Sequence, residues 1–464
     1  MSIIRNMLLI GAVVSGVIIL VLLFQGDERE KYLKMLGSEK TRQEAVIGFF
    51  VLKEDIVPFL SEELRKRDNS EMTDIGIVTV LGKKFNSHED PRIAAVFVQV
   101  MEYKPLRVRK AIYGTGLESR SKEMLPLIRA WLGEDSDDIH AAVLARIPAF
   151  EKELQNDESL NRRVLQKIAD IKDSPDRNVK ELSGSILGRE IKKKVEAARD
   201  AAANFNFVKA EDALESGRKL DPESPLINYA IGKFLLKAKK ERQKGEAILS
   251  QYGFLYRVRP AHTAPRIDGD LDEKLWNESV SLQGFYRSIS GDYIYRQPVT
   301  NINAYVRYDS RHLYLAASGH GNYKRLKGKA NRRDGAVWRD DCCEIYIDSD
   351  FNEQSFYQIV INYKGMIYDR LVKNSSRRRR RHRSGTGWNG SFTVGTKLKQ
   401  GESWSVEVCI PWETLGLDKQ PDAGDVWGFN LTWVKQVKPA EYAQWCPTYG
   451  SAHHPQYFGL LVFE

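Results

Sequence analysis

The chain has 464 residues, of which 42% are hydrophobic and 29% charged, and it is long enough for two or three globular domains. Its formal net charge is +9, but the run RRRRRHR at residues 377–383 supplies six of these positive charges. The rest of the chain therefore has an excess of only three positive charges. This balance gives no reason to expect a nucleic-acid partner.

Four cysteines, Cys342, Cys343, Cys409 and Cys446, are too few for a disulfide scaffold. Neighbouring residues of a strand point to opposite faces, so at most one of Cys342 and Cys343 can readily pair with Cys409 or Cys446. The sequence contains no CxxC and no Cys/His cluster at zinc spacing, so we expect no zinc site.

Residues 1–26 are predicted to be a membrane anchor. The run MLLIGAVVSGVIILVLLF at residues 7–24 is apolar or small throughout. As a helix it would be about 27 Å long, close to the roughly 30 Å of a bilayer's hydrocarbon core. A cleaved signal peptide or a buried helix is the alternative, although no A-x-A cleavage pattern follows the run. Basic residues stand on both sides of it and do not decide the orientation.

Residues 27–253 are predicted to be helical. The segments 56–64, 91–100, 124–132 and 139–147 have apolar residues at intervals of three and four, typical of paired amphipathic helices. We therefore predict an α-solenoid of HEAT-like repeats over residues 27–189. Residues 190–253 are more similar to a tetratricopeptide pair, broken by the sequence DPESP at residues 221–225. Such a surface commonly binds protein, but it can equally be a spacer.

Residues 254–464 are predicted to form an antiparallel β-sandwich. The segments 303–309, 357–363 and 403–410 are short and rich in β-branched and aromatic residues. Gly365, Gly401 and Gly424 mark turns between such segments. The predicted fold is thus multidomain: a transmembrane helix, an α-solenoid of helix pairs, and a β-sandwich at the C-terminal end.

This last region resembles the family 9 carbohydrate-binding modules and their DOMON-like relatives. The resemblance rests on an ordered series of segments that spans nearly all of residues 260–464. The series includes IDGDLDE at 267–273, VWRDDCCEIYID at 337–348, IPW at 410–412 and GFNLTW at 428–433. It implies a sandwich that binds sugars and carries out no chemistry.

The resemblance also implies a set of binding residues. Sugar-binding members of the family hold a terminal sugar between two Trp rings, while Glu, Asn and Arg bind its hydroxyls, because flat aromatic faces cover the C–H face of a pyranose. The matching positions of this chain are Trp338, Glu344, Arg370, Asn430 and Trp433.

Each of these residues also has a structural alternative. Trp433 has the same strand parity as Phe429 and Leu431, so it can belong to a core face with Asn430 pointing the other way. Glu344 can pair with an arginine across the sheet.

Asp268, Asp270 and Asp272 alternate in the IDGDLDE segment and are similar to a loop that binds a hard cation, so structural calcium is the predicted cofactor. The alternative is a solvated turn in which aspartates cap neighbouring amides.

Ser, Asn and Gly flank the basic run at 377–383 and predict an exposed loop, which would attract a polyanion such as an acidic polysaccharide. The run contains no interleaved aromatic residues that could stack on nucleic-acid bases.

The predicted function is that of a membrane-anchored, single-pass carbohydrate-binding protein, with everything after residue 26 outside the cytoplasm and no catalysis. Its expected partners are a poly- or oligosaccharide, the membrane and a protein bound by the helical repeats. One alternative is a scaffolding protein of a cell-surface assembly. Another is a haem-binding member of the same fold, for which Met366 is the sole methionine after residue 254. The carboxylates Asp340 and Asp341 are neighbours on a strand and point apart, so they do not predict an acid and base pair.

Overall fold

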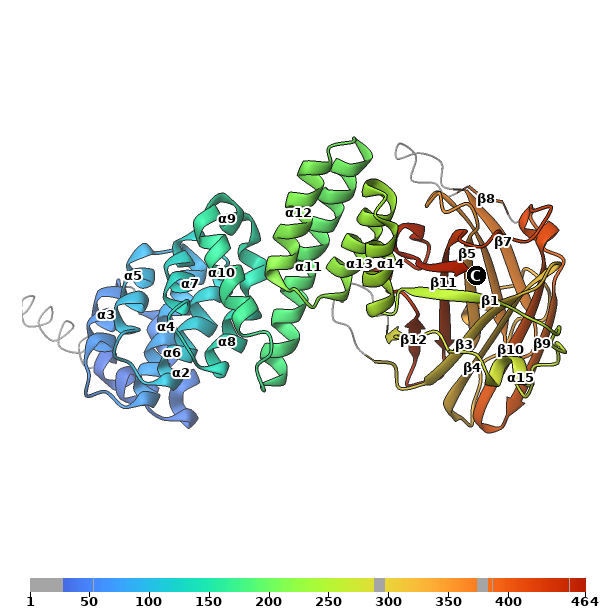
Figure 1. The fold of residues 1–464 in the computed structure, drawn as a ribbon. Coiled ribbons are helices and arrows are strands. Elements are labelled where there is room, and N and C mark those ends of the chain that lie inside the picture. The colour runs from blue at the N-terminus through green and yellow to red at the C-terminus, as the bar shows by residue number, and fades with distance from the viewer. Residues whose placement is uncertain (1–27, 53, 288–296, 374–382, 386, 450) are drawn as a thin grey trace, which may run out of the picture. The chain divides into compact units, whose positions relative to one another are not determined.

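The computed structural model describes residues 28–52, 54–287, 297–373, 383–385, 387–449 and 451–464 (Figure 1). The chain divides into two compact units, Met1–Leu187 and Gly188–Glu464. The predicted membrane anchor, residues 1–26, lies outside the described residues, and so does most of the basic run at 377–383. Within the described ranges, no helix combines the length and the apolar character needed to cross a bilayer.

The first unit is helical, as the sequence predicts. Its elements are α2 (Glu39–Val51), α3 (Val57–Arg65), α4 (Glu71–His88), α5 (Pro91–Val100), α6 (Leu106–Gly116), η1 (Leu117–Ser119), η2 (Lys122–Met124), α7 (Leu125–Trp131), α8 (Asp137–Leu144), η3 (Ile147–Phe150), α9 (Glu151–Asn156) and α10 (Glu158–Asp170). α11 (Arg177–Ala203) begins in this unit and ends in the next.

Helices of the first unit pack against the next helix but one in sequence. α4 contacts α2 and α6, and α6 contacts α8, while α5 contacts α3 and α7. The helices thus form two rows, with buried apolar residues such as Ile77, Phe97 and Trp131 between them. Ser70 and Asp90 are the N-caps of α4 and α5, because their side chains accept hydrogen bonds from backbone amides in the first turn of each helix.

The second unit opens with the last part of α11, followed by α12 (Phe207–Leu220), α13 (Pro225–Phe234) and α14 (Arg242–Gln251). A π-helical turn, η4 (Leu235–Lys239), lies between α13 and α14. The predicted break at 221–225 is confirmed, since α12 ends at Leu220 and α13 starts at Pro225. Ile227, Tyr229 and Leu249 of these helices belong to the same buried core as the strands that follow. The predicted boundary between residues 253 and 254 therefore does not separate two compact units.

The strands are β1 (Leu255–Pro260), β2 (Tyr286–Arg287), β3 (Asn301–Tyr308), β4 (His312–Tyr323), β5 (Cys342–Asp348), β6 (Ser355–Asn362), β7 (Ile367–Lys373), β8 (Arg383–Gly385), β9 (Thr393–Lys399), β10 (Gly401–Pro411), β11 (Val426–Lys435), β12 (Glu441–Gln444) and β13 (Gly459–Phe463). Short helical turns lie between them: α15 (Lys274–Asn277), η5 (Val337–Arg339), η6 (Trp412–Leu415) and η7 (Pro455–Tyr457). The turn glycines at 365, 401 and 424 all have positive φ, between 77° and 95°.

Two sheets face each other across the core. Sheet A has the order β8-β7-β6-β5-β11-β13-β1, with β12 also paired to β11 and β2 paired to β12. Sheet B has the order β1-β3-β4-β10-β9. β1 belongs to both sheets, and the strands curl around the core in Figure 1. The pairing is antiparallel as predicted except at β1, which runs parallel to β13 and to β3.

The alternation of side chains along β5 decides which residues enter the core. Cys343, Ile345 and Ile347 point between the sheets, whereas Cys342 belongs to a small separate cluster on the other face of sheet A. This arrangement confirms that the adjacent cysteines point to opposite faces. The four cysteines are free thiols in the described structure.

Candidate functional site

A cavity of about 540 Å³ lies on the outer face of sheet A, the face that points away from the main core. It is lined by Glu344 and Tyr346 of β5, Gln358 of β6, Tyr368 and Arg370 of β7, Thr432 of β11, Tyr442 and Gln444 of β12, Trp338 of η5, and Ala452 and His453. Its volume lies in the range of roughly 300–1,000 Å³ that is usual for small-molecule sites.

Strand register explains why these residues share one face. Glu344 lies opposite Thr432 on β11, and Gln358 lies between Tyr346 on one side and Arg370 on the other. Directly paired residues in a sheet point to the same face, so five neighbouring strands present polar side chains in two adjacent rows on that face. Trp338 reaches these rows because η5 immediately precedes β5.

A hydrogen-bond network holds the polar side chains in place. Arg370 donates from Nε to Gln358 Oε1 at 2.7 Å, and its Nη2 lies 2.9 Å from Nε2 of His453. The amide nitrogen of Gln358 lies 3.5 Å from Glu344 Oε2, and the Tyr346 hydroxyl donates to that same carboxylate oxygen. The planar groups are therefore fixed before any ligand arrives, which lowers the entropy cost of binding.

Burial dominates the electrostatics of Glu344. It raises the pKa of this carboxyl, while the hydrogen bonds from Tyr346 and Gln358 and the charge of Arg370 act in the opposite direction. Burial also raises the pKa of the Tyr346 hydroxyl well above 10. Among the described residues, Glu344 does not form the cross-strand ion pair with an arginine that was its structural alternative. The neighbouring Arg370 makes its hydrogen bonds to Gln358 and His453 instead.

The rim of the cavity is aromatic. Trp338 is 41% exposed and Tyr442 is 42% exposed, which is unusual for such large rings. The Trp338 ring packs edge-on against Tyr368, with centroids 4.8 Å apart, so its orientation is supported from one side. Below the rim, the Thr432 hydroxyl is buried and has no hydrogen-bond partner among the described residues.

Three of the five predicted binding residues, Trp338, Glu344 and Arg370, come together in this cavity. The other two, Asn430 and Trp433, do not line it. Trp433 is 1% exposed and stacks on Trp404 of sheet B at a centroid distance of 4.1 Å.

Two contacts hold the Trp433 ring between the sheets. Its Nε1 donates to the Tyr323 hydroxyl at 2.8 Å, and the ring lies so close to Gly319 that a Cβ there would be 2.4 Å from Nε1. The structural alternative for Trp433, a core position, is thus the one observed, and the structure does not place it as a second sugar-facing ring.

Asn430 does point to the outer face of sheet A, but the segment after β12 covers it. Its Nδ2 donates to the carbonyl of Cys446 at 2.8 Å, and its Oδ1 accepts from the amide of Cys446 at 2.9 Å. The side chain is fully buried and fixes the covering segment. Asn430 therefore does not contact the cavity, but it positions the chain between β12 and β13, which borders the cavity.

Sequence reasoning did not predict Gln358, His453 and Tyr442 as site residues. Gln358 has a signal in the sequence, because it is a polar residue flanked by Tyr357 and Ile359 in an otherwise apolar strand. His453 has no such signal, since it lies in a loop 83 positions after Arg370 and meets it only through the fold.

The IDGDLDE segment is anchored by a buried carboxylate. Glu407 of β10 is fully buried, and its carboxylate accepts hydrogen bonds from the amides of Asp268 and Gly269 and from Nε1 of Trp276, at 2.8–3.1 Å. Gly269 has φ +88°, and a Cβ there would lie 2.4 Å from the backbone of Thr396. This loop is therefore pinned against sheet B.

The aspartates of this loop make their contacts with basic side chains and with a backbone amide, and the charges of all three act on Lys397. Asp268 pairs with Arg266 and caps the amide of Asp270, whose own carboxylate pairs with Lys397. Within the described ranges, no group of three or more His, Cys, Asp or Glu side chains is arranged to hold a metal ion. The bond from the Asp270 amide to Asp268 is the contact that the capped-turn alternative predicts, and calcium binding by this loop stays a prediction.

The fold and the site together define a β-sandwich domain with a cavity whose polar side chains are held by hydrogen bonds to one another. Residues 267–464 match the family model described as carbohydrate family 9 binding domain-like, which confirms the resemblance seen in the sequence.

Two solved structures are similar to this region. One is titled a "putative carbohydrate-binding protein" from Bacteroides uniformis, with a TM-score of 0.35, 18% identity and coverage of 45% of this chain and 99% of that chain. The other is a family 9 carbohydrate-binding module from Caldicellulosiruptor kristjanssonii in complex with glucose, with a TM-score of 0.31, 20% identity and coverage of 45% of this chain and 96% of that chain. No curated protein matches the chain.

Proposed function

We propose that the protein binds a saccharide in the cavity on the outer face of sheet A. The observation that carries this proposal is the exposed ring of Trp338 beside the fixed groups of Glu344 and Arg370, in a domain whose sequence matches a family 9 carbohydrate-binding model. Both chemical requirements of sugar binding are present: an apolar ring for the C–H face and planar polar groups for the hydroxyls.

The roles of the polar groups follow from their partners. Arg370 is a donor, Glu344 is an acceptor, and a ligand hydroxyl would satisfy the buried Thr432 hydroxyl. Because Gln358 and His453 already orient Arg370, we expect the network to bind a sugar with little rearrangement.

We further propose that binding is not followed by catalysis. Glycoside hydrolysis ordinarily uses two carboxyl groups on either side of the scissile bond. Glu344 is the one acid among the described residues that line the cavity, and Tyr346 and Gln358 hold it.

The N-terminal run and the helical unit would place this binding domain at a membrane. The apolar run at residues 7–24 would anchor the protein in a membrane as a single span, with the bulk of the chain on the extracytoplasmic side. The two rows of helices in the first unit support a HEAT-like solenoid, which would act as a spacer or bind a protein partner.

Calorimetric titration of the full chain with neutral and acidic oligosaccharides, glucose included, tests the central proposal. Trp338→Ala and Arg370→Gln should each weaken binding by about tenfold or more, equivalent to about 1.4 kcal/mol. Phe205→Ala is the matched control, because it removes an aromatic ring that is 83% exposed and lies outside the cavity.

Two results would contradict the proposal. One is the absence of saturable binding across the panel in a chain shown to be folded. The other is binding that Trp338→Ala and Phe205→Ala leave equally unchanged. The first would favour a scaffolding role for the domain.

A further inference from the structure

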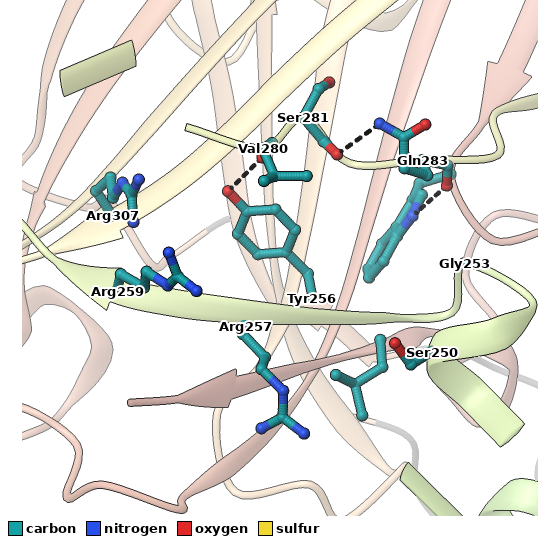
Figure 2. A pocket seen from close by; sticks show the side chains of 11 residues that line it. Ser250, Gly253, Tyr256, Arg257, Arg259, Val280, Ser281, Gln283 and Arg307 are labelled. Atoms are coloured by element: carbon teal, nitrogen blue, oxygen red, sulfur yellow. Dashed lines mark hydrogen bonds between the residues drawn. The ribbon is translucent and has the colours of Figure 1, made fainter. Parts of the chain in front are cut away.

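A second cavity, of about 250 Å³, lies where β1 passes from one sheet to the other. β1 pairs with β13 over residues 255–258 and with β3 at residues 259–260, so part of its other edge is left without a partner strand. The cavity lies beside this strand, and Figure 2 shows its lining from close by. Three arginines, Arg257, Arg259 and Arg307, line it, and none of the other described lining residues is acidic.

Arg307 is the most unusual of the three. It projects from β3 and is 7% exposed, which is rare for a guanidinium group. Its Nε donates to the Ser279 hydroxyl at 2.9 Å, and that hydroxyl donates in turn to the carbonyl of Leu275 at 2.6 Å. No described carboxylate forms an ion pair with it, and its terminal N–H groups have no partner in the described structure.

Arg257 and Arg259 are more exposed and partly neutralised. Arg259 Nε lies 3.0 Å from the Glu464 carboxylate, and Arg257 lies 2.9 Å from Glu246. Neither acid lines the cavity. Three guanidinium groups therefore share two carboxylates, and the buried one of the three has none.

The neutral groups of the lining already have partners. The Tyr256 hydroxyl donates to the carbonyl of Val280 at 2.9 Å, Gln283 Nε2 donates to the carbonyl of Ser281, and Nε1 of Trp445 donates to the carbonyl of Gln283. Dashed lines mark these bonds in Figure 2. The donors left for a ligand are thus guanidinium N–H groups, which suit oxygen atoms of an anion.

We propose that this cavity binds a sulfate or phosphate group, with Arg307 as the buried donor and Arg259 as the donor at the opening. Such an anion would supply the charge that Arg307 lacks and would accept several N–H groups at once. The site is separate from the saccharide cavity and shares no lining residue with it. The anion can be a free ion or an ester group on a larger ligand, since both present the same oxygens.

Titration of the full chain with sodium sulfate and with sodium phosphate, each against sodium chloride at equal ionic strength, tests the proposal. Saturable binding of one of the two oxyanions, without an effect of chloride, is expected. A comparison of glucose with glucose 6-sulfate separates a free ion from an ester group. If the site accepts an ester, glucose 6-sulfate binds in a way that depends on Arg307, whereas glucose shows no binding that depends on Arg307.

Arg307→Gln and Arg259→Gln should each weaken oxyanion binding by about tenfold or more. Arg259 is largely exposed, so its substitution leaves the fold intact even if Arg307→Gln does not. Arg311→Gln is the matched control, because Arg311 is an exposed arginine outside the cavity. Binding that is absent, that chloride reproduces, or that Arg259→Gln and Arg311→Gln affect equally would overturn the proposal. Saccharide binding by Trp338 is measured independently and is expected to be unchanged in all three variants.

Discussion

Replacement of Glu407 by glutamine is expected to destabilise the second unit by about 2–4 kcal/mol. Both carboxylate oxygens of Glu407 face N–H donors: Oε2 accepts from Asp268 and Gly269, and Oε1 accepts from Trp276. Glutamine has one oxygen, so its amide N–H₂ must face at least one of these donors. At pH 5, where the carboxyl is protonated, a lost neutral hydrogen bond contributes about 0.5–1.5 kcal/mol and a buried unsatisfied donor about 1–3 kcal/mol.

The effect should also depend on pH. Burial raises the pKa of Glu407 from 4.5 to about 7, although the hydrogen bonds from Trp276 and Gly269 oppose this rise. A raised pKa in the folded state means that the folded protein binds the proton more tightly. The stabilisation is therefore complete below pH 4.5 and is lost as the pH rises through 7. A change of about 2.5 in pKa corresponds to about 3 kcal/mol.

Urea denaturation of the wild type and of Glu407→Gln at pH 5 and pH 8 measures both quantities. The loss of unfolding free energy in the variant should be larger at pH 5 than at pH 8, because only the wild type titrates at this position. Equal losses at the two pH values would refute the argument from burial. No loss at either pH would refute the role of Glu407 in holding the IDGDLDE loop.

Three further substitutions test buried contacts elsewhere in the second unit. Trp433→Ala should lower the unfolding free energy by about 3–5 kcal/mol, because the ring is packed against Trp404. An unchanged denaturation midpoint would contradict the buried position of this ring. Asn430→Ala should cost about 1–3 kcal/mol and speed hydrogen exchange at the Cys446 amide, whereas unaltered exchange would contradict its bracing role. Lys233→Met should cost about 3 kcal/mol at pH 7, because it leaves Glu353 buried without one of its partners. Burial acts to raise the pKa of Glu353, but the neighbouring lysines lower it to about 2, so the stabilisation is lost as the pH falls from 4.5 through 2. If the difference in unfolding free energy between the wild type and Lys233→Met stays constant between pH 7 and pH 2.5, Lys233 does not stabilise the ionised form of Glu353.

The sequence alone determined the order and type of the elements. The proline breaks at 221–225 separate α12 from α13, and alternation along residues 342–348 separates the core face of β5 from its outer face. These features are local, because helix and strand periods are properties of neighbouring residues. The resemblance to family 9 carbohydrate-binding modules, rather than any periodicity, pointed to Trp338, Glu344 and Arg370 as binding residues before any fold was known.

The tertiary structure alone decided which outer-face residues are open. Asn430 and Thr432 lie on the same face of β11, yet the segment around Cys446 covers the first and leaves the second in the cavity. Likewise, His453 meets Arg370, and β1 runs parallel between two sheets, through contacts between distant parts of the chain. Such contacts depend on register and on the path of loops, and local periodicity contains no information about either.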